Sequence, residues 1–240
     1  MIRVVSTFYN VEKYIESCVI SVKNQEHKDF VCYLIDDMST DNTPQIIESL
    51  IKDDKRFVFI KNTEKKFKTR NMVELLSNEE IDDEDIVVEL DGDDHLFDEK
   101  VLDKIIKVYS EDDIWITNGS FVYANGMFGF SSPQSNFETL RKDRFTASHL
   151  RTWKVFLWRE IEDKDHKDKN GEYFKFNPDL AYMLPMLEMA GPKHYKYIPD
   201  FLLVYNDQNP LNEHKVDMNM VTTLAAEIRS RKKYPRLQIW

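Results

Sequence analysis

The sequence predicts an α/β fold in which a central, mostly parallel sheet is flanked by helices, as in a Rossmann-like sandwich. Three observations support this prediction. Short apolar runs of strand type alternate with segments of helical periodicity through the first half of the 240 residues. Such alternation builds parallel sheets with helices on both faces. Polar clusters at residues 7–10, 36–41 and 91–94 also lie at the ends of three of the apolar runs, and parallel sheets bind their ligands beyond the carboxyl ends of the strands.

The elements of the first half follow from short apolar runs and from apolar stripes. The runs predict strands at residues 2–8, 31–35, 57–60, 86–90 and 114–117. Helical periodicity predicts helices at residues 12–25, 69–76 and 101–109. A further helix is expected after Thr43, which caps it, with Pro44 at its first position, where proline loses no hydrogen bond.

The second half is less regular. Its expected elements are a hairpin at 121–130, an aromatic-rich helix at 149–158, an exposed and mobile charged loop at 159–172, a helix at 179–190, a strand at 194–205 and a helix at 218–232. Asn125 and Gly126 suit the type I′ turn of the hairpin. Pro185 should kink the helix at 179–190, and Gly191 should end it.

Composition argues against several classes of protein. A net charge of −10 does not suit a protein that holds nucleic acid by a basic surface. The chain lacks any run of about 18 apolar residues, so no transmembrane segment is expected. Cys18 and Cys32 fall on a helix stripe and in a strand, which predicts buried free thiols and a reducing, cytoplasmic location.

The most informative segment is an apolar run that ends in Asp91, Gly92, Asp93 and Asp94. Three carboxylates within four positions repel one another unless a cation lies among them. Oxygen ligands of this kind suit a hard divalent ion, either Mn²⁺ or Mg²⁺. Gly92 permits a sharp turn or a close approach to a ligand. Taken alone, the same residues would also suit a solvated acidic turn.

Together with two earlier segments, this motif resembles the family 2 glycosyltransferases of the GT-A fold. The segments are STFYNVEKY at 6–14, IDDMSTDNT at 35–43 and LDGDD at 90–94. The family reads roughly P-T-Y-N-x-E-x-Y, V-D-D-G-S-T-D-x-T and L-D-A-D-D in the same order. Ser6 and Met38 depart from the family's usual Pro and Gly, but neither position supplies essential chemistry. The likeness is firm over about residues 2–109.

This resemblance implies a single GT-A domain over residues 1–240, with a nucleotide-sugar-binding half (1–118) and an acceptor-side half (119–240). It implies a hexosyltransferase that moves a sugar from a nucleotide-sugar, with a UDP-sugar the first choice, to a hydroxyl of a glycan or other acceptor with inversion. Three alternatives remain open: a Mg²⁺-dependent phosphatase of the haloacid dehalogenase type, a nucleotidyltransferase, and a non-catalytic sugar-nucleotide-binding module.

On the nucleotide side, the residues implied to border the base are Thr7, Phe8 and Tyr9. Asp37, with Asp36, would accept a hydrogen bond from a uracil ring nitrogen. Arg70 matches a basic residue that approaches the base or the diphosphate in the family. The alternatives are that Asp36 and Asp37 merely cap a turn and that Arg70 is solvated.

On the metal side, the resemblance implies that Asp93 ligates the ion and that Asp91 reaches the ion or the ribose. Gly92 would let the backbone approach the donor, and Asp94 would support the ligands. A histidine is a candidate for a further ligand or a phosphate contact. His214 is preferred over His149 and His194, because residues 206–215 resemble a loop that closes over the diphosphate.

An inverting transferase also needs a base for the acceptor hydroxyl. In the family an acidic residue that opens a late helix supplies it, and Asp179 fits that position. The alternative is that Asp179 only balances the helix dipole. Rival bases in the charged loop are Asp163, Asp165 and Asp168. Aromatic residues that form either an acceptor platform or core are Trp153, Phe156 and Trp158.

Overall fold

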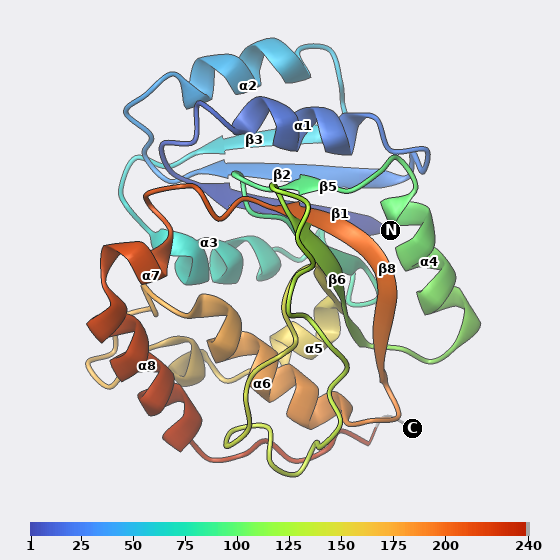
Figure 1. Cartoon of the computed structure of the whole chain (residues 1–240), viewed down its shortest axis with the longest axis vertical. Helices are drawn as coiled ribbons and strands as arrows, with labels where there is room; N and C mark the ends of the chain where they lie inside the picture. Colours follow the sequence, from blue (N-terminus) through green and yellow to red (C-terminus); the bar gives the residue numbers. More distant parts are fainter. Residues whose placement is uncertain (239–240) are drawn as a thin grey trace.

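The structure is a computed structural model that describes residues 1–238, apart from the side chains of Glu213 and His214. Within this part, eight strands form one sheet in the order β3-β2-β1-β4-β7-β6-β8-β5 (Figure 1). The strands are β1 (Ile2–Phe8), β2 (Phe30–Asp36), β3 (Phe57–Lys61), β4 (Ile86–Glu89), β5 (His95–Leu96), β6 (Ile116–Tyr123), β7 (Arg151–Lys154) and β8 (Tyr195–Tyr205). The predicted α/β architecture is confirmed.

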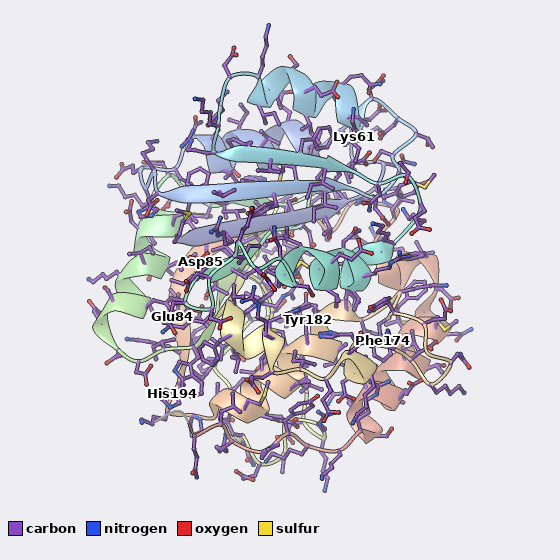
Figure 2. The ribbon with its side chains drawn as sticks, turned by 180° about the vertical axis from the view of Figure 1, so that it is seen from behind. Lys61, Glu84, Asp85, Phe174, Tyr182 and His194 are labelled. Atoms are coloured by element: carbon purple, nitrogen blue, oxygen red, sulfur yellow. The ribbon has the colours of Figure 1, made fainter. Side chains whose placement is uncertain are left out.

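Helices cover both faces of this sheet. They are α1 (Ile15–Lys23), α2 (Thr43–Ile51), α3 (Phe67–Leu76), α4 (Val101–Glu111), α5 (Val155–Arg159), the 3-10 helix η1 (Asp163–His166), α6 (Pro178–Ala190), α7 (Glu213–Val216) and α8 (Met218–Ser230). Figure 1 shows α1 and α2 on one side of the sheet and α3, α6 and α8 on the other. Each side has its own apolar core, and Phe174 and Tyr182 belong to the core under α3 and α6 (Figure 2).

The parallel part of the sheet brings three strand ends to one edge. β1 lies between β2 and β4 and runs parallel to both, with Thr7 opposite Ile35 and Val5 opposite Glu89. The carboxyl ends of the three strands therefore meet, and the three polar clusters follow them directly. Two of the clusters are also bonded to each other, because the Oδ1 atom of Asn10 accepts from the Thr40 amide at 2.8 Å.

The turn after β2 contains one of the two departures from the family motif. Met38 has φ of +70°, in the left-handed region that glycine adopts most easily. The family's usual glycine at this point is therefore explained by backbone conformation. Met38 adopts the same conformation, and the residue is 42% exposed.

The prediction of a helix at 149–158 is wrong. Residues 151–154 form strand β7, which inserts antiparallel between β4 and β6, and only α5 is helical. Trp153 lies opposite Val87 and is fully buried. Pairing on both edges and burial of this ring outweigh the local helical pattern, since strand preference depends mainly on tertiary packing.

Two further expectations for the second half need adjustment. The turn at Asn125 and Gly126 forms, with the Tyr123 amide donating to the Met127 carbonyl at 2.8 Å, but it follows the long strand β6 and closes only a short hairpin. The loop expected to be exposed at 159–172 contains η1, whose His166 is buried and stacked on Trp158 at 4.8 Å. Aromatic packing therefore holds part of this charged segment against the core.

Helix α6 positions Asp179, the acidic residue predicted at the start of a late helix. It starts at Pro178, continues through Pro185 as one helix, and ends where Gly191 takes φ of +62°. Its residues are buried almost throughout, between the sheet and α8. Only its first turn reaches the edge where the strands end. Among residues 1–238, every helix is too short or too polar to traverse a bilayer.

Candidate functional site

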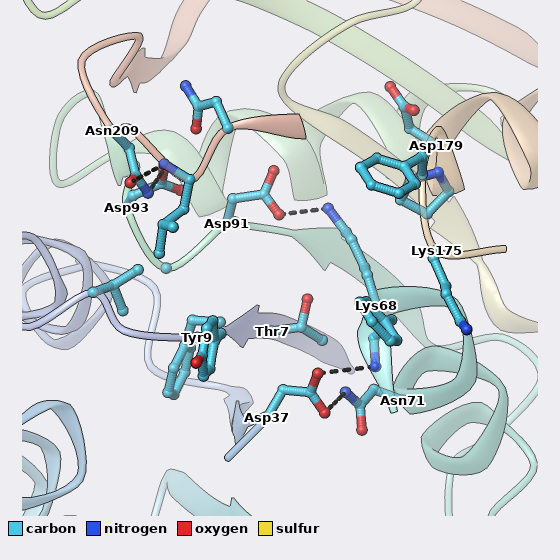
Figure 3. A pocket seen from close by; sticks show the side chains of 18 of the residues that line it. Thr7, Tyr9, Asp37, Lys68, Asn71, Asp91, Asp93, Lys175, Asp179 and Asn209 are labelled. Atoms are coloured by element: carbon cyan, nitrogen blue, oxygen red, sulfur yellow. Dashed lines mark hydrogen bonds and ion pairs between the residues drawn. The ribbon is translucent and has the colours of Figure 1, made fainter. Parts of the chain in front are cut away.

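A cavity of about 530 Å³ lies at the carboxyl edge of β1, β2 and β4 (Figure 3). It brings together most of the residues that the sequence predicted. Those that line it are Thr7, Phe8, Tyr9, Asp37, Asp91, Gly92, Asp93 and Asp179. Sequence reasoning missed the functional potential of further lining residues, namely Lys65, Lys68, Asn71, Arg151, Lys175, Tyr205 and Asn209.

Gly92 is required at the floor of this cavity. A Cβ atom on Gly92 would lie 2.6 Å from the Cβ of Phe8, much closer than real atoms approach. Phe8 is itself buried at the end of β1. Glycine therefore lets the turn after β4 pack directly on the end of β1. It thereby determines how closely the loop that carries Asp91 and Asp93 approaches this strand.

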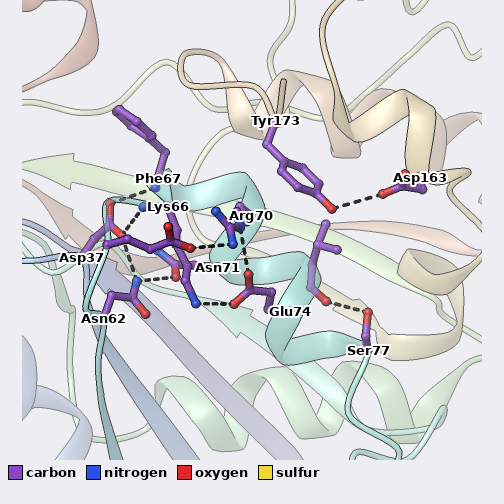
Figure 4. Close-up of polar contacts among 12 residues, drawn as sticks. Asp37, Asn62, Lys66, Phe67, Arg70, Asn71, Glu74, Ser77, Asp163 and Tyr173 are labelled. Atoms are coloured by element: carbon purple, nitrogen blue, oxygen red, sulfur yellow. Dashed lines mark hydrogen bonds and ion pairs between the residues drawn. The ribbon is translucent and has the colours of Figure 1, made fainter. Parts of the chain in front are cut away.

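The carboxylate of Asp37 is fixed by several donors from one neighbouring segment (Figure 4). Its Oδ1 accepts from the amides of Asn62 at 2.9 Å and Asn71 at 3.1 Å, and from the Lys66 backbone N–H at 2.8 Å. Its Oδ2 accepts from the Phe67 backbone N–H at 2.9 Å. Burial raises the pKa of Asp37, but these hydrogen bonds outweigh it and hold the pKa below its ordinary value.

The neighbouring acid is placed differently. Asp36 is buried, accepts from the Ser39 amide at 3.0 Å and does not line the cavity. It shapes the turn, as the alternative reading of the pair proposed. Adjacent strand residues point to opposite faces, which is why only one member of the pair faces the cavity.

Arg70 also lies away from the cavity. Its guanidinium contacts Glu64 at 2.7 Å and Glu74 at 2.9 Å on the surface of α3 (Figure 4). Lys68 and Asn71 line the cavity instead. Residues three apart share one face of a helix. Because Lys68 and Asn71 face the cavity, Arg70 points to solvent.

Lys65 supplies the cation nearest to Asp37. Its Nζ atom lies 3.0 Å from the centroid of the Tyr9 ring, donates to the Asp37 carbonyl at 3.1 Å, and is 3.5 Å from the Asp37 Oδ2 atom. Burial lowers the pKa of Lys65, and the Asp37 carboxylate opposes this effect. The ammonium thus covers an aromatic face at the end of β1.

Asp91, Asp93 and Asp94 form an acidic cluster in the turn after β4. Two of its carboxyls, those of Asp93 and Asp94, are hard to ionise. Burial and the charge of Asp91 raise the pKa of Asp93 to about 6, although the Asn209 amide donates to its Oδ2 at 2.7 Å. Burial, Asp93 and Asp91 raise the pKa of Asp94 well above its ordinary value. The Oδ1 of Asp94 accepts from the Asn206 backbone N–H at 2.8 Å, whereas its buried Oδ2 has no hydrogen-bond partner among the described residues.

This cluster fits a hard divalent cation. One ligand atom each from Asp91, Asp94 and His149 lies within 4.8 Å of the other two. A cation there would satisfy the buried Oδ2 of Asp94 and offset the repulsion that raises the carboxyl pKa values. Burial, then Arg151, lowers the pKa of His149 to about 3, so its ring is neutral, as a ligand requires. The preferred ligand, His214, has a side chain outside the described residues.

A chain of ion pairs joins the acidic cluster to Asp179. Lys68 contacts both Asp91 and Glu89 (Figure 3 shows the first pair). Arg151 binds Glu89 with two hydrogen bonds of 2.9 Å and reaches Asp179 at 3.2 Å. Burial opposes ionisation of Glu89, but Arg151 and Lys68 hold its pKa well below the usual range. Asp179, 34% exposed, is the end of this chain that faces the cavity.

The rival site residues lie elsewhere. Asp163 and Asp165 are absent from the cavity lining, and Asp165 accepts from Tyr234 at 2.6 Å. Asp168 accepts from backbone amides of its own loop. His194 stacks on Trp115 at 3.6 Å. Trp153, Phe156 and Trp158 also do not line the cavity but pack in or against the core, as the alternative reading proposed.

The comparison with protein families shows to which family the chain belongs. The model of Glycosyl transferase family 2 matches residues 3–159, which include all three motifs. The chain belongs to glycosyltransferase family 2. This membership accounts for the acidic motif together with the two motifs before it, and the phosphatase alternative left those two earlier motifs unexplained.

Two curated proteins resemble this family 2 glycosyltransferase over parts of its length. The teichoic acid poly(glycerol phosphate) polymerase of Staphylococcus epidermidis is 38% identical over 60 residues, 25% of this chain and 8% of that protein. An uncharacterized glycosyltransferase of Haemophilus influenzae is 28% identical over 127 residues, 52% of this chain and 48% of that protein. The chain thus spans less than half of either relative.

Solved structures share the fold at low identity. S. aureus TarS 1–349 in complex with UDP-GlcNAc has a TM-score of 0.64 and 18% identity, covering 87% of this chain and 59% of that chain. The mannosyltransferase PcManGT of Pyrobaculum calidifontis, in complex with GDP-Man and Mn²⁺, has a TM-score of 0.62 and 17% identity, covering 97% and 65%. The GT-A type fold predicted for this family 2 glycosyltransferase is confirmed.

Proposed function

We propose that this chain is a metal-dependent hexosyltransferase that moves a sugar from a nucleotide-sugar to a hydroxyl group of a glycan or other acceptor, with inversion. A UDP-sugar is the first choice of donor. The observation that carries the proposal is that Asp179 lines the same cavity as the acidic cluster and as Tyr9 and Asp37. The part of the cavity that Tyr9 and Asp37 line is called the Tyr9–Asp37 side. The relatives bound to UDP-GlcNAc and to GDP-Man with Mn²⁺ support it.

In this proposal residues 1–118 hold the donor nucleotide. Tyr9 offers a ring face to the base, Thr7 borders it, and Asp37 accepts from a ring N–H. The four donors that fix Asp37 support this role, because a preorganised acceptor loses little freedom when it binds. Residues 119–240 contribute Asp179 and the acceptor side.

Mn²⁺ or Mg²⁺ is the proposed cofactor, held by Asp91 and Asp93, with His214 as a further ligand. The orphaned Oδ2 of Asp94 and the neutral ring of His149 add two more candidate ligands. When bound, the ion supplies a Lewis acid that offsets the negative charge growing on the departing diphosphate. Lys68, bound to Asp91 and Glu89, holds the acidic loop in place from the other side.

Asp179 is the proposed base. It takes the proton of the acceptor hydroxyl as the hydroxyl oxygen bonds to the anomeric carbon of the sugar. The bond from that carbon to the phosphate oxygen breaks at the same time, and its electron pair leaves with the nucleoside diphosphate. Attack from the face opposite the leaving group inverts the anomeric configuration. The 3.2 Å contact from Arg151 supports this role, because it fixes the carboxylate at the cavity wall.

The test is incubation of the chain with a panel of sugar nucleotides and Mn²⁺, with and without simple glycan acceptors. We expect release of one nucleoside diphosphate and, by NMR, a product with the anomeric configuration opposite to the donor's. Tight donor binding with no turnover on any acceptor would favour the non-catalytic module. Hydrolysis of phosphate monoesters without nucleotide would contradict the proposal.

A further inference from the structure

One wall of the cavity is apolar and has no role in the proposed reaction. Its members come from the chain around the start of α6 and from the segment around α7 and α8, and they are Phe176, Pro178, Leu211, Val216 and Val221. Leu211 is 44% exposed and Val216 is 57% exposed. Among the described residues, Leu211, Val216 and Val221 belong to neither apolar core. Their side chains therefore face the cavity and solvent and not the interior of the fold.

This apolar wall is held close to the proposed base. The carbonyl oxygen of Val221 accepts a hydrogen bond from the Nδ2 atom of Asn177 at 2.6 Å. Asn177 precedes the first residue of α6, and Asp179 is the second residue of that helix. The bond therefore joins the first turn of α8 to the start of α6. An acceptor whose hydroxyl group contacts Asp179 has the apolar wall beside the rest of its structure.

Apolar surface also continues outside the cavity. Met218 is the first residue of α8 and Val221 the fourth, so the two side chains share one face of the helix. Met218 is 56% exposed. Single exposed apolar residues are ordinary, but a contiguous apolar stretch that leads out of a cavity marks a binding groove. The hydroxyl groups of a sugar do not account for it, because burying a hydroxyl group without a hydrogen bond costs free energy.

We propose that the acceptor carries an apolar group, which the apolar wall binds while a hydroxyl group of the acceptor's sugar faces Asp179. This inference rests on the proposed function and adds the class of acceptor to it: an amphiphilic glycoside, with a sugar at one end and an alkyl chain or similar group at the other. The apolar group lies along Val221 and Val216 and leaves the cavity over Met218. The nucleotide stays at the Tyr9–Asp37 side, so the two substrates occupy different parts of the cavity.

The test is calorimetric titration of the whole chain, saturated with UDP and Mn²⁺, with the methyl and octyl β-glycosides of glucose, galactose and N-acetylglucosamine. The octyl glycosides are kept below the concentration at which they form micelles. We expect each octyl glycoside to bind at least about tenfold more tightly than its methyl counterpart, as the burial of about two methylene groups would give. In a transfer assay the octyl group should lower KM for the acceptor and leave kcat nearly unchanged, because the wall binds ground state and transition state alike.

Two substitutions shorten side chains of the wall and of its continuation on α8. Val221→Ser and Met218→Ser should each reduce the ratio of octyl to methyl affinity about fivefold. Val221→Ser keeps the backbone carbonyl that binds Asn177, so the start of α6 stays in place. The matched control is Met127→Ser. Met127 is 59% exposed, much like Met218, but it lies in the hairpin after β6 and not at the cavity, so this variant should keep the wild-type ratio.

Equal wild-type affinities for octyl and methyl glycosides would overturn the inference and leave the proposed function standing. An octyl preference that both wall variants keep, or that Met127→Ser loses equally, would also overturn it, because octyl chains would then bind elsewhere. The same holds for a dimer in sedimentation, or binding to phosphatidylcholine vesicles, that Met218→Ser abolishes, because a second copy or a membrane would then cover the wall. Failure of the wild-type chain to bind UDP in Mn²⁺ would overturn the proposed function and the inference with it.

Discussion

Asp179 is the acidic residue on which the proposed chemistry depends most directly. We expect Asp179→Asn to lower the turnover rate by about 10²–10⁴-fold, the usual contribution of a general base. Donor affinity should change little, because the Tyr9–Asp37 side and the acidic cluster stay intact. Steady-state kinetics and nucleotide titration measure the two effects. Asp163→Asn, outside the cavity lining, is the control and should retain wild-type turnover. Near-normal turnover in Asp179→Asn would remove Asp179 from the base role.

Asp93 should be essential for turnover and should also control how the metal-free protein responds to pH. Its folded pKa is raised from 3.8 to about 6, so the folded protein holds this proton more tightly than the unfolded chain does. The carboxyl is therefore harmless below about pH 4 and destabilises the fold progressively as pH rises to about 6. Asp93→Asn should abolish turnover yet remove this loss.

The measurement is the melting temperature in chelator across that pH range, for wild type and Asp93→Asn. The difference between the two proteins should grow as pH rises from about 4 to about 6 and then stay constant. Asp98→Asn is the control, because Asp98 is paired with Lys104 at 2.8 Å outside the cluster. A difference that does not vary with pH would mean that Asp93 titrates normally.

At the scale of single elements, β7 is the strand that joins the two halves of the sheet. Arg151 on this strand is the buried partner of Glu89. We expect Arg151→Met to lower the free energy of unfolding by about 3–5 kcal/mol, because it leaves a buried carboxylate with only Lys68 and Tyr182 as partners. Urea denaturation measures the loss.

Lys154→Met is the matched control on the same strand. Lys154 pairs with Glu84 at 2.7 Å, and the Glu84 side chain is 69% exposed. An ion pair of this kind contributes less than about 1 kcal/mol. Similar losses in both variants would show that β7 depends on strand packing and not on the buried charge.

The strand–helix units of the first half could be predicted because their signals are local. The run before Asp91 is apolar and short, and Pro44 marks a helix start. The identity of β7 could not be predicted in this way. Its pairing with β4 joins residues 62 positions apart, as in the contact of Arg151 with Glu89, and no short-range pattern records such a contact.

The residues of the site likewise fall into those that the sequence predicts and those that it does not. Tyr9, Asp37 and Asp91 follow parallel strands, so topology alone predicts that they meet. Lys68 could have been found, because helical phase places it on the face of Asn71 and opposite Arg70. Asn209 could not, since the amide that binds Asp93 is 116 residues away in the chain.

At the scale of the whole molecule, the cavity joins both halves of the chain, so ligand binding should stabilise the entire fold. UDP at about 100 times its dissociation constant, with Mn²⁺, should add roughly 2.7 kcal/mol to the free energy of unfolding. For a chain of this size that corresponds to an increase in melting temperature of roughly 5–10 °C. Thermal unfolding with Mn²⁺ and with chelator measures the effect. An equal shift in chelator would show that UDP binds without a metal.

The long-range pairing of β4 and β7 also has a consequence for the order of assembly during synthesis. Glu89 leaves the ribosome well before its partners Arg151 and Tyr182, which follow 62 and 93 residues later. Until then β4 has a free edge with a carboxylate that burial would penalise, so we expect the early strand–helix units to wait in a loosely packed state. Protease digestion of stalled nascent chains tests this, since chains ending near residue 118 should be cleaved far faster than chains that include α6. Glu89, which Lys68 and Arg151 connect to Asp91 and Asp179, would then also delay closure of the sheet until both halves of the chain are present.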